Sequence, residues 1–156
     1  MGYAATHGNI DIVKLLIESG AKELNSALGL AATKGHIEIV KLLLGKGADI
    51  NGKTDFEGSK PLIDAAFGGQ ITMVKFLLAE GADINSADDC NGYTALMVAA
   101  QKGYRNIVET LIMNGANLNI EAKGAIAESN GKTALAQAEQ TGHSDIVHLL
   151  KNAGGK

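Results

Sequence analysis

Hydrophobic positions in this chain fall into short runs that are separated by glycine and polar residues. Residues 91–119, NGYTALMVAAQKGYRNIVETLIMNGANLN, show the arrangement most completely. They predict a turn at the first two residues, a helix over 94–102 that stops at Gly103, and a second helix over 106–113 that stops at Gly115. Glycine suits both stops because the residue after a helix often needs a positive φ angle, which costs least without a Cβ atom.

The same arrangement recurs along the whole chain. The stops of the first helices are Gly8, Gly35, Gly69, Gly103 and Gly142. The stops of the second helices are Gly20, Gly47, Gly81, Gly115 and Gly154. Both series have spacings of 27, 34, 34 and 39 residues, and two series that agree even in the irregular steps are hard to obtain by chance. Five units of one solenoid therefore explain the 156 residues better than one compact domain does.

The stretch described above resembles the ankyrin repeat. The segments that carry the resemblance are GYTAL at 92–96, AAQKG at 99–103, IV at 107–108 and LIMNGANLN at 111–119. Similar endings, such as GADIN, extend it over nearly the whole chain. It implies a mainly α fold, an ankyrin-repeat solenoid of stacked antiparallel helix pairs with β-hairpin-like finger loops. We expect a single domain over 1–156, with units at roughly 1–25 (partial), 26–52, 53–86, 87–119 and 120–156.

Three units depart from the regular pattern. The first starts inside a helix and lacks a polar outer face, so we expect further repeats or another domain before Met1 in the native protein. The second lacks a finger, because Asn25 runs almost directly into its first helix. The fifth follows a longer finger over 120–130, and its helices form a polar closing cap that carries Glu139, Ser144 and Lys151.

Composition and charge narrow the classes of partner. Hydrophobic residues make up 46% of the chain and aromatic residues only 4%, so the core is built from Ala, Leu, Ile and Val. A net charge of -3, with 13 Lys and one Arg spread along the units, predicts no nucleic-acid partner. No apolar run is long enough for membrane insertion. The single cysteine, Cys90, fits a cytoplasmic protein, although a secreted effector without disulfides fits equally well.

One segment matches a nucleotide-binding motif by its letters but not by its context. Residues 47–54, GADINGKT, fit the phosphate-loop pattern G-x4-G-K-[ST]. That loop must follow a strand and open a helix, so that backbone N–H groups converge on a phosphate. Here the pattern follows a predicted helix over 39–44 and runs into a turn at 55–58. We therefore expect no nucleotide, and a thermal midpoint that does not respond to Mg-ATP would remove this alternative.

Other candidate chemistry is weaker still. The four histidines show no metal-ligand spacing with Cys90, and His36 and His143 follow an inter-helix glycine, where the resemblance implies a structural histidine. Residues 88–92, DDCNG, lack the alternating oxygen ligands of a calcium loop and predict a hairpin turn. No nucleophile elbow or paired carboxylates occur. The chain is therefore predicted to be no enzyme and to have no catalytic, cofactor-binding or metal-binding residue.

The resemblance implies that a partner docks on the concave face, which is formed by the finger tips and the exposed ends of the first helices. The matching positions are Thr33, Lys34, Asp55, Phe56, Glu57, Ser59, Phe67, Asp89, Cys90, Asn91, Tyr93, Gln101, Lys102, Lys132 and Gln140. Phe56, Phe67 and Tyr93 are the candidate anchors, because aromatic side chains dominate many interfaces. The alternative for Phe56 and Phe67 is that they fold back and pack internally.

The predicted function is non-catalytic binding of an unknown protein partner by a monomer, through a pre-formed concave surface and without a cofactor. Rigid stacking limits the entropy that is lost on binding. The alternative is that the chain is an accessory segment of a larger enzyme, toxin or secreted effector.

Overall fold

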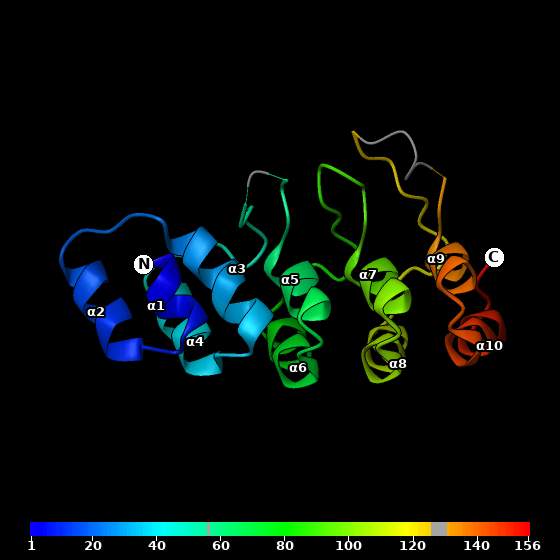
Figure 1. Ribbon diagram of the computed structural model, residues 1–156, viewed down its shortest axis with the longest axis horizontal. Coiled ribbons are helices and arrows are strands. Elements are labelled where there is room, and N and C mark those ends of the chain that lie inside the picture. Colours follow the sequence, from blue (N-terminus) through cyan, green and yellow to red (C-terminus); the bar gives the residue numbers. More distant parts are fainter. Residues whose placement is uncertain (56, 126–130) are drawn as a thin grey trace.

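The computed structural model describes residues 1–55, 57–125 and 131–156, and Figure 1 shows these as a row of helix pairs. The prediction of a mainly α solenoid is confirmed. The helices, in chain order, are α1 (Gly2–Thr6), α2 (Ile10–Glu18), α3 (Leu24–Lys34), α4 (Ile37–Gly45), α5 (Pro61–Phe67), α6 (Ile71–Ala79), α7 (Ala95–Lys102), α8 (Arg105–Met113), α9 (Ala134–Thr141) and α10 (Ser144–Asn152).

The helices form two layers. The first helices of the pairs, α1, α3, α5, α7 and α9, pack on one another in sequence, and the second helices, α2, α4, α6, α8 and α10, pack beside them. Finger loops precede α5 and α7 and project from the same edge of the array as the described part of the segment before α9 (Figure 1). Of the longer finger predicted over 120–130, residues 126–130 lie outside the described residues. No finger precedes α3, as predicted, but α3 begins at Leu24, so Asn25 lies inside this helix and not before it.

Glycine ends the helices as predicted. All ten glycines of the two series have positive φ angles, between 70° and 94°. Gly35, Gly103 and Gly142 hold the left-handed conformation directly after a first helix. At the other end of α5, Pro61 is in the first helical turn, where its missing N–H has no partner to lose.

Helix starts differ from prediction by one residue. Thr94, predicted as the first residue of α7, has an extended backbone, and its hydroxyl accepts a hydrogen bond from the backbone N–H of Met97 at 3.3 Å. Thr133 caps α9 in the same way through Ala136. A threonine whose oxygen satisfies an unpaired N–H of the first turn belongs before the helix, which explains the shift.

The core differs between the two layers. The first helices meet through alanines, of which Ala31, Ala65 and Ala99 are fully buried. The second helices contribute larger side chains, such as Leu43, Leu77 and Leu111, which are also fully buried. Small residues let the first helices approach closely, while burial of each large side chain stabilises the stack by roughly 1.5 to 3 kcal/mol. Stability therefore comes from the contact of each pair with its neighbours.

A ladder of asparagines joins consecutive pairs at the ends of the second helices. In each rung the side-chain oxygen of an asparagine accepts a hydrogen bond from a backbone N–H of the next pair. The rungs are Asn51 to Asp83 (2.8 Å), Asn85 to Asn117 (2.9 Å) and Asn119 to Lys156 (2.8 Å). Asn25, in the first turn of α3, accepts a similar bond from the backbone N–H of Asp49, which follows α4 of the same pair (2.8 Å). The GADIN-like endings thus form the connection between units.

The residue after each inter-helix glycine covers the glycine of the preceding pair. The covering side chains are His36 over Gly8, Gln70 over Gly35, Tyr104 over Gly69 and His143 over Gly103. Both histidines also bond across the contact, since the Nε2 atoms of His36 and His143 lie 3.0 and 3.1 Å from the backbone oxygens of Thr6 and Gln101. The structure therefore agrees with the prediction that His36 and His143 have a structural role.

The outer faces of the first and last pairs differ in polarity. On the first pair, Tyr3, Ile12 and Leu15 are 77%, 50% and 61% exposed. On the last pair, Glu139 and Lys151 form an ion pair of 2.8 Å between Oε1 and Nζ. This is the contrast that the sequence predicts.

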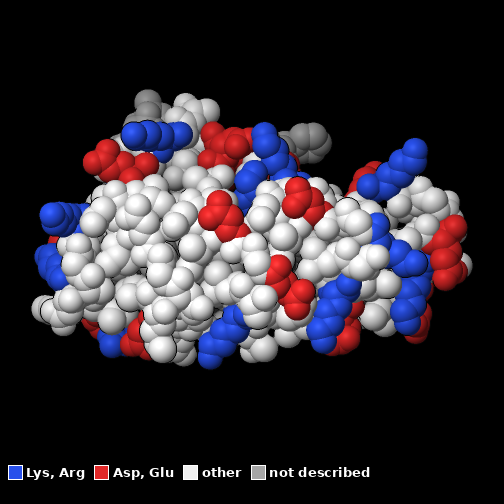
Figure 2. All heavy atoms as spheres, turned by 180° about the vertical axis from the view of Figure 1, so that it is seen from behind, with Lys and Arg blue, Asp and Glu red and all other residues white. Residues whose placement is uncertain are grey.

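Charges are mixed on the face shown in Figure 2, where Lys and Arg alternate with Asp and Glu and no broad area of one sign appears. None of the helices in the described residues is both long and apolar enough to cross a membrane.

Candidate functional site

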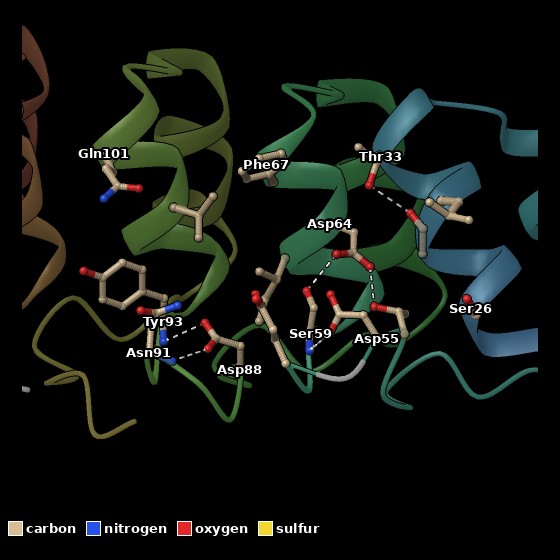
Figure 3. A pocket seen from close by; sticks show the side chains of 16 residues that line it. Ser26, Thr33, Asp55, Ser59, Asp64, Phe67, Asp88, Asn91, Tyr93 and Gln101 are labelled. Carbon is tan, nitrogen blue, oxygen red and sulfur yellow. Dashed lines mark hydrogen bonds between the residues drawn. The ribbon is translucent and has the colours of Figure 1, made fainter. Parts of the chain in front are cut away.

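A groove of about 540 Å³ lies between α3, α5, α7 and the fingers that precede α5 and α7. We call it the finger groove. Its walls are Ser26, Gly29, Leu30, Thr33, Thr54, Asp55, Glu57, Ser59, Ile63, Asp64, Phe67, Asp88, Asn91, Tyr93, Val98 and Gln101. Figure 3 shows the side chains that line it.

The finger groove brings together about half of the predicted concave-face residues. Those that line it are Thr33, Asp55, Glu57, Ser59, Phe67, Asn91, Tyr93 and Gln101. Those that lie outside its walls are Lys34, Asp89, Cys90, Lys102, Lys132 and Gln140. Phe56 falls outside the described residues.

A partly buried carboxylate forms the floor of the groove. The Oδ2 atom of Asp64 accepts a hydrogen bond of 2.6 Å from the Thr54 hydroxyl, and Oδ1 accepts one of 2.7 Å from the Ser59 hydroxyl (Figure 3). Burial raises the pKa of Asp64 above 3.8, although the two hydroxyl donors oppose this, and the nearby charge of Asp55 adds to the rise. The cluster ties both sides of the finger to α5.

Two glycines let α3 and α5 approach closely, and one of them lies against this cluster. A Cβ atom on Gly29 of α3 would lie 2.5 Å from Oδ2 of Asp64 and 2.5 Å from Cβ of Thr54. A Cβ atom on Gly68, after α5, would lie 2.0 Å from the backbone oxygen of Thr33. A larger residue at Gly29 would displace the side chains of Asp64 and Thr54, and one at Gly68 would require movement of the backbone. The contact between α3 and α5 therefore depends on the absence of side chains at these positions.

The fingers hold two further carboxylates at the groove. Asp88 accepts hydrogen bonds from the backbone N–H groups of Asn91 at 2.6 Å and Tyr93 at 3.0 Å, which closes the finger before α7. Asp55 accepts one from the backbone N–H of Ser59 at 2.9 Å. Ala87 and Thr94 form an antiparallel bridge at the base of the finger before α7, so the predicted hairpin turn at 88–92 is confirmed.

Tyr93 does not project as the exposed anchor that the sequence analysis expected. Its side chain is only 9% exposed, and its hydroxyl accepts a hydrogen bond of 2.6 Å from Nε2 of Gln137, which is also buried. Gln137 in turn accepts a weaker bond of 3.3 Å from Gln101. The buried Gln137 amide of α9 stabilises the buried position of Tyr93, because each polar group supplies the hydrogen-bond partner that the other needs. Tyr93 thus lines the groove as part of its wall.

The helix side of the groove is apolar. Phe67 is 54% exposed and Leu30 is 40% exposed, and both line the groove. Phe67 therefore does not fold back into the core, which was the alternative for this residue. The Nζ atom of Lys102 lies 4.4 Å from the centre of the Phe67 ring, a cation–π contact that holds the ring at the edge of the groove.

Residues 47–54, which match the phosphate-loop pattern, lead into the finger before α5 and not into a helix. Lys53 pairs with Asp89 of the next finger at 2.5 Å, and the hydrogen bond from Lys53 lowers the pKa of the Asp89 carboxyl. Thr54 is bonded to Asp64, and the next helix begins only at Pro61. The backbone N–H groups after the motif therefore do not start a helix and cannot converge on a phosphate as they do in a phosphate loop. Within the described residues, no group of His, Cys, Asp and Glu side chains could hold a metal ion.

Sequence reasoning missed half of the groove wall. The missed residues are Ser26, Gly29, Leu30, Thr54, Ile63, Asp64, Asp88 and Val98. One signal was available for Asp64, since it is the only charged residue in the otherwise apolar helix PLIDAAF. The remaining residues belong to the groove only because neighbouring units bring them together.

Stacked helix pairs with paired glycine stops and a row of fingers define a class of α-helical repeat proteins. The family model described as "Ankyrin repeats (3 copies)" matches residues 1–54, 30–122 and 91–156, which together span the chain. The chain belongs to the ankyrin repeat family. Comparison with curated proteins gave no match. Ankyrin repeats are generally protein–protein interaction modules and are typically non-catalytic.

Proposed function

We propose that this chain is a non-catalytic binding module that takes a segment of a partner protein into the finger groove. The observation that carries the proposal is the exposed Phe67 ring beside Leu30 in a groove of about 540 Å³. Exposed apolar side chains gathered in a concavity mark binding sites more often than the same side chains scattered on a surface.

The walls of the groove support the proposal because they are held in place before a partner arrives. Hydrogen bonds fix Asp55, Asp64, Asp88 and Tyr93, and the finger before α5 is joined to the next finger through the backbone oxygen of Glu57, which accepts bonds from the N–H groups of Asp89 and Cys90 at 3.0 and 3.2 Å. A pre-organised surface loses less entropy on binding.

Affinity capture with matched variants tests this proposal. We expect the double variant Leu30→Ala/Phe67→Ala to lose the partner that the wild-type chain captures from a lysate of its source. The control is Ile12→Ala/Met113→Ala, which removes two exposed apolar side chains, 50% and 85% exposed, from the outer helices α2 and α8. Both variants should keep the helical circular dichroism signal and thermal midpoint of the wild type. Retention of the same partner by the groove variant would move the binding site elsewhere.

A further inference from the structure

The finger groove has two chemically different halves. On the helix side, Leu30 and Phe67 present apolar surface. The fingers contribute the carboxylates of Asp55, Glu57 and Asp88, and α5 adds that of Asp64 beside them, while no Lys, Arg or His occurs among the described residues of the wall. The groove therefore joins an apolar shelf, at whose edge Lys102 lies over the Phe67 ring, to a local excess of negative charge on its wall.

Neighbouring groups neutralise this charge only in part. Asp55 and Asp88 accept hydrogen bonds from uncharged backbone N–H groups, and Asp64 accepts from uncharged hydroxyls. Within the described residues, the Glu57 carboxylate takes part in no ion pair. Lys53, on the same finger, is already paired with Asp89.

The pKa of the Cys90 thiol responds to the negative charges at the edge of the groove. Partial burial raises its pKa, and the charges of Glu57, Asp88 and Asp55 raise it further. A negative potential at this edge of the groove stabilises a cation that enters it and repels an anion. Since no metal-holding group occurs in the described residues, the complementary species is an organic cation with N–H donors.

We propose that the finger groove selects a partner segment in which an arginine or lysine lies beside an apolar residue. The cation faces the carboxylates of the fingers, and the apolar side chain lies on Leu30 and Phe67. This inference rests on the proposed function, because it names the chemistry of the segment that the same groove takes up. Arginine suits the site better than lysine, because its planar fork of N–H donors can contact several carboxylates at once.

The distance between Asp64 and Phe67 predicts the distance between the cation and the apolar side chain of the bound segment. Asp64 and Phe67 are three residues apart on α5, so they share one face of the helix with their Cβ atoms about 5 to 6 Å apart. In an extended peptide, side chains two positions apart point to the same side and are separated by about 6.6 to 7 Å. An extended segment with the cation and the apolar residue two positions apart therefore fits the groove.

A displayed library of random short peptides, selected on the full chain, provides the probe. Clones that lose binding to Leu30→Ala/Phe67→Ala but keep it to Ile12→Ala/Met113→Ala are the groove-dependent clones. We expect these to be enriched in arginine or lysine two positions from an apolar residue. Synthetic peptides of the same sequences then give dissociation constants by fluorescence anisotropy, at low and at high salt.

Charge-neutral variants complete the test. Asp55→Asn/Glu57→Gln keeps a side-chain oxygen at both positions, so the hydrogen bond to Ser59 survives while two negative charges are lost. The control Asp11→Asn/Glu38→Gln loses the same charge from exposed positions on α2 and α4. We expect the groove variant to weaken the groove-dependent peptides about tenfold, more at low salt than at high salt, and the control to change them by less than about twofold.

Two results would overturn the inference, and they are distinguishable. Groove-dependent peptides without cation enrichment, or with equal affinity for both charge variants, would refute the choice of a basic segment and leave the proposed function standing. If no clone depends on Leu30 and Phe67, the finger groove is not a peptide site, and the proposed function fails together with the inference.

Discussion

The contacts between α3 and α5 and between α7 and α9 join equivalent helices in different ways. At the second contact, His143 bonds to the backbone of Gln101 across the gap, and Gln137 bonds to Tyr93. At the first, the residue equivalent to His143 is Gln70, whose Nε2 donates to the backbone oxygen of Gly68 within its own pair at 3.1 Å.

Close approach of the backbones distinguishes the contact between α3 and α5. Gly68 stands where the other first helices have Lys34, Lys102 and Thr141, and it lets the backbone of α3 come against α5. Gly29 stands where α7 has the buried Met97. Side chains such as Met97 fill the contact between α7 and α9. Between α3 and α5, the glycine at the equivalent position leaves room for the side chains of Asp64 and Thr54. One repeated backbone therefore yields a bonded contact in one place and a groove in another.

The largest expected effect comes from closing the space at Gly68. Its φ angle of -76° is open to any residue, so Gly68→Ala acts only through the clash with the backbone oxygen of Thr33. We expect a loss of about 2 to 3 kcal/mol in the free energy of unfolding, measured with urea. The control is Gly45→Ala, within α4, where a Cβ atom meets nothing within 4 Å and alanine should be neutral or stabilising. Equal stability of the two variants would contradict the close-approach account.

A smaller effect is expected at the bonded contact. Tyr93→Phe removes the hydroxyl that accepts from Gln137 and leaves a buried N–H without its acceptor. We expect a loss of about 1 to 2 kcal/mol in urea unfolding. The matched control is Tyr104→Phe, because this ring is 36% exposed and its hydroxyl can turn to water. A Tyr93→Phe variant as stable as that control would show that the bond contributes nothing measurable.

The smallest effect is a pH dependence at Asp64. Because burial raises its pKa, the folded state holds the proton more tightly than the unfolded state does. The contribution of this group to stability is therefore fully present below its ordinary pKa of 3.8 and is lost as the pH rises through the raised value.

The side chain of the Asp64→Asn variant cannot titrate. The pH dependence that comes from all other groups is the same in the wild type and the variant, so it cancels when their stabilities are compared. We expect the wild type to gain stability relative to this variant as the pH falls from about 7 to about 4, measured by chemical denaturation at several pH values. A difference that is constant with pH, or that grows toward neutral pH, would show that the carboxylate is not desolvated in the folded chain.

The regular parts of this fold follow from the sequence alone. The two glycine series predict the ends of the helices because a backbone position with a positive φ angle strongly favours glycine. The missing finger at Asn25 and the structural histidines follow from the same comparison of units. These features are local or strictly periodic, so one unit informs the next.

The groove could be predicted only in part, because it depends on departures from the period. Gly29 and Gly68 have ordinary backbone angles, so nothing in the local sequence separates them from glycines that merely tolerate their positions. Their role appears only when Thr54 and Thr33 are brought against them. Tyr93 was predicted as a candidate anchor, and its burial could not be predicted because its partner, Gln137, lies 44 residues away in the next unit.

The asparagine ladder bears on how an array of this kind can change length during evolution. Each rung needs one asparagine side chain from the earlier unit and only a backbone N–H from the later one. Almost any residue can supply that N–H. A duplicated unit inserted within the array therefore brings both the backbone N–H that bonds to the unit before it and the asparagine that bonds to the unit after it. Gene duplication can therefore lengthen the solenoid without a compensating substitution at the junction.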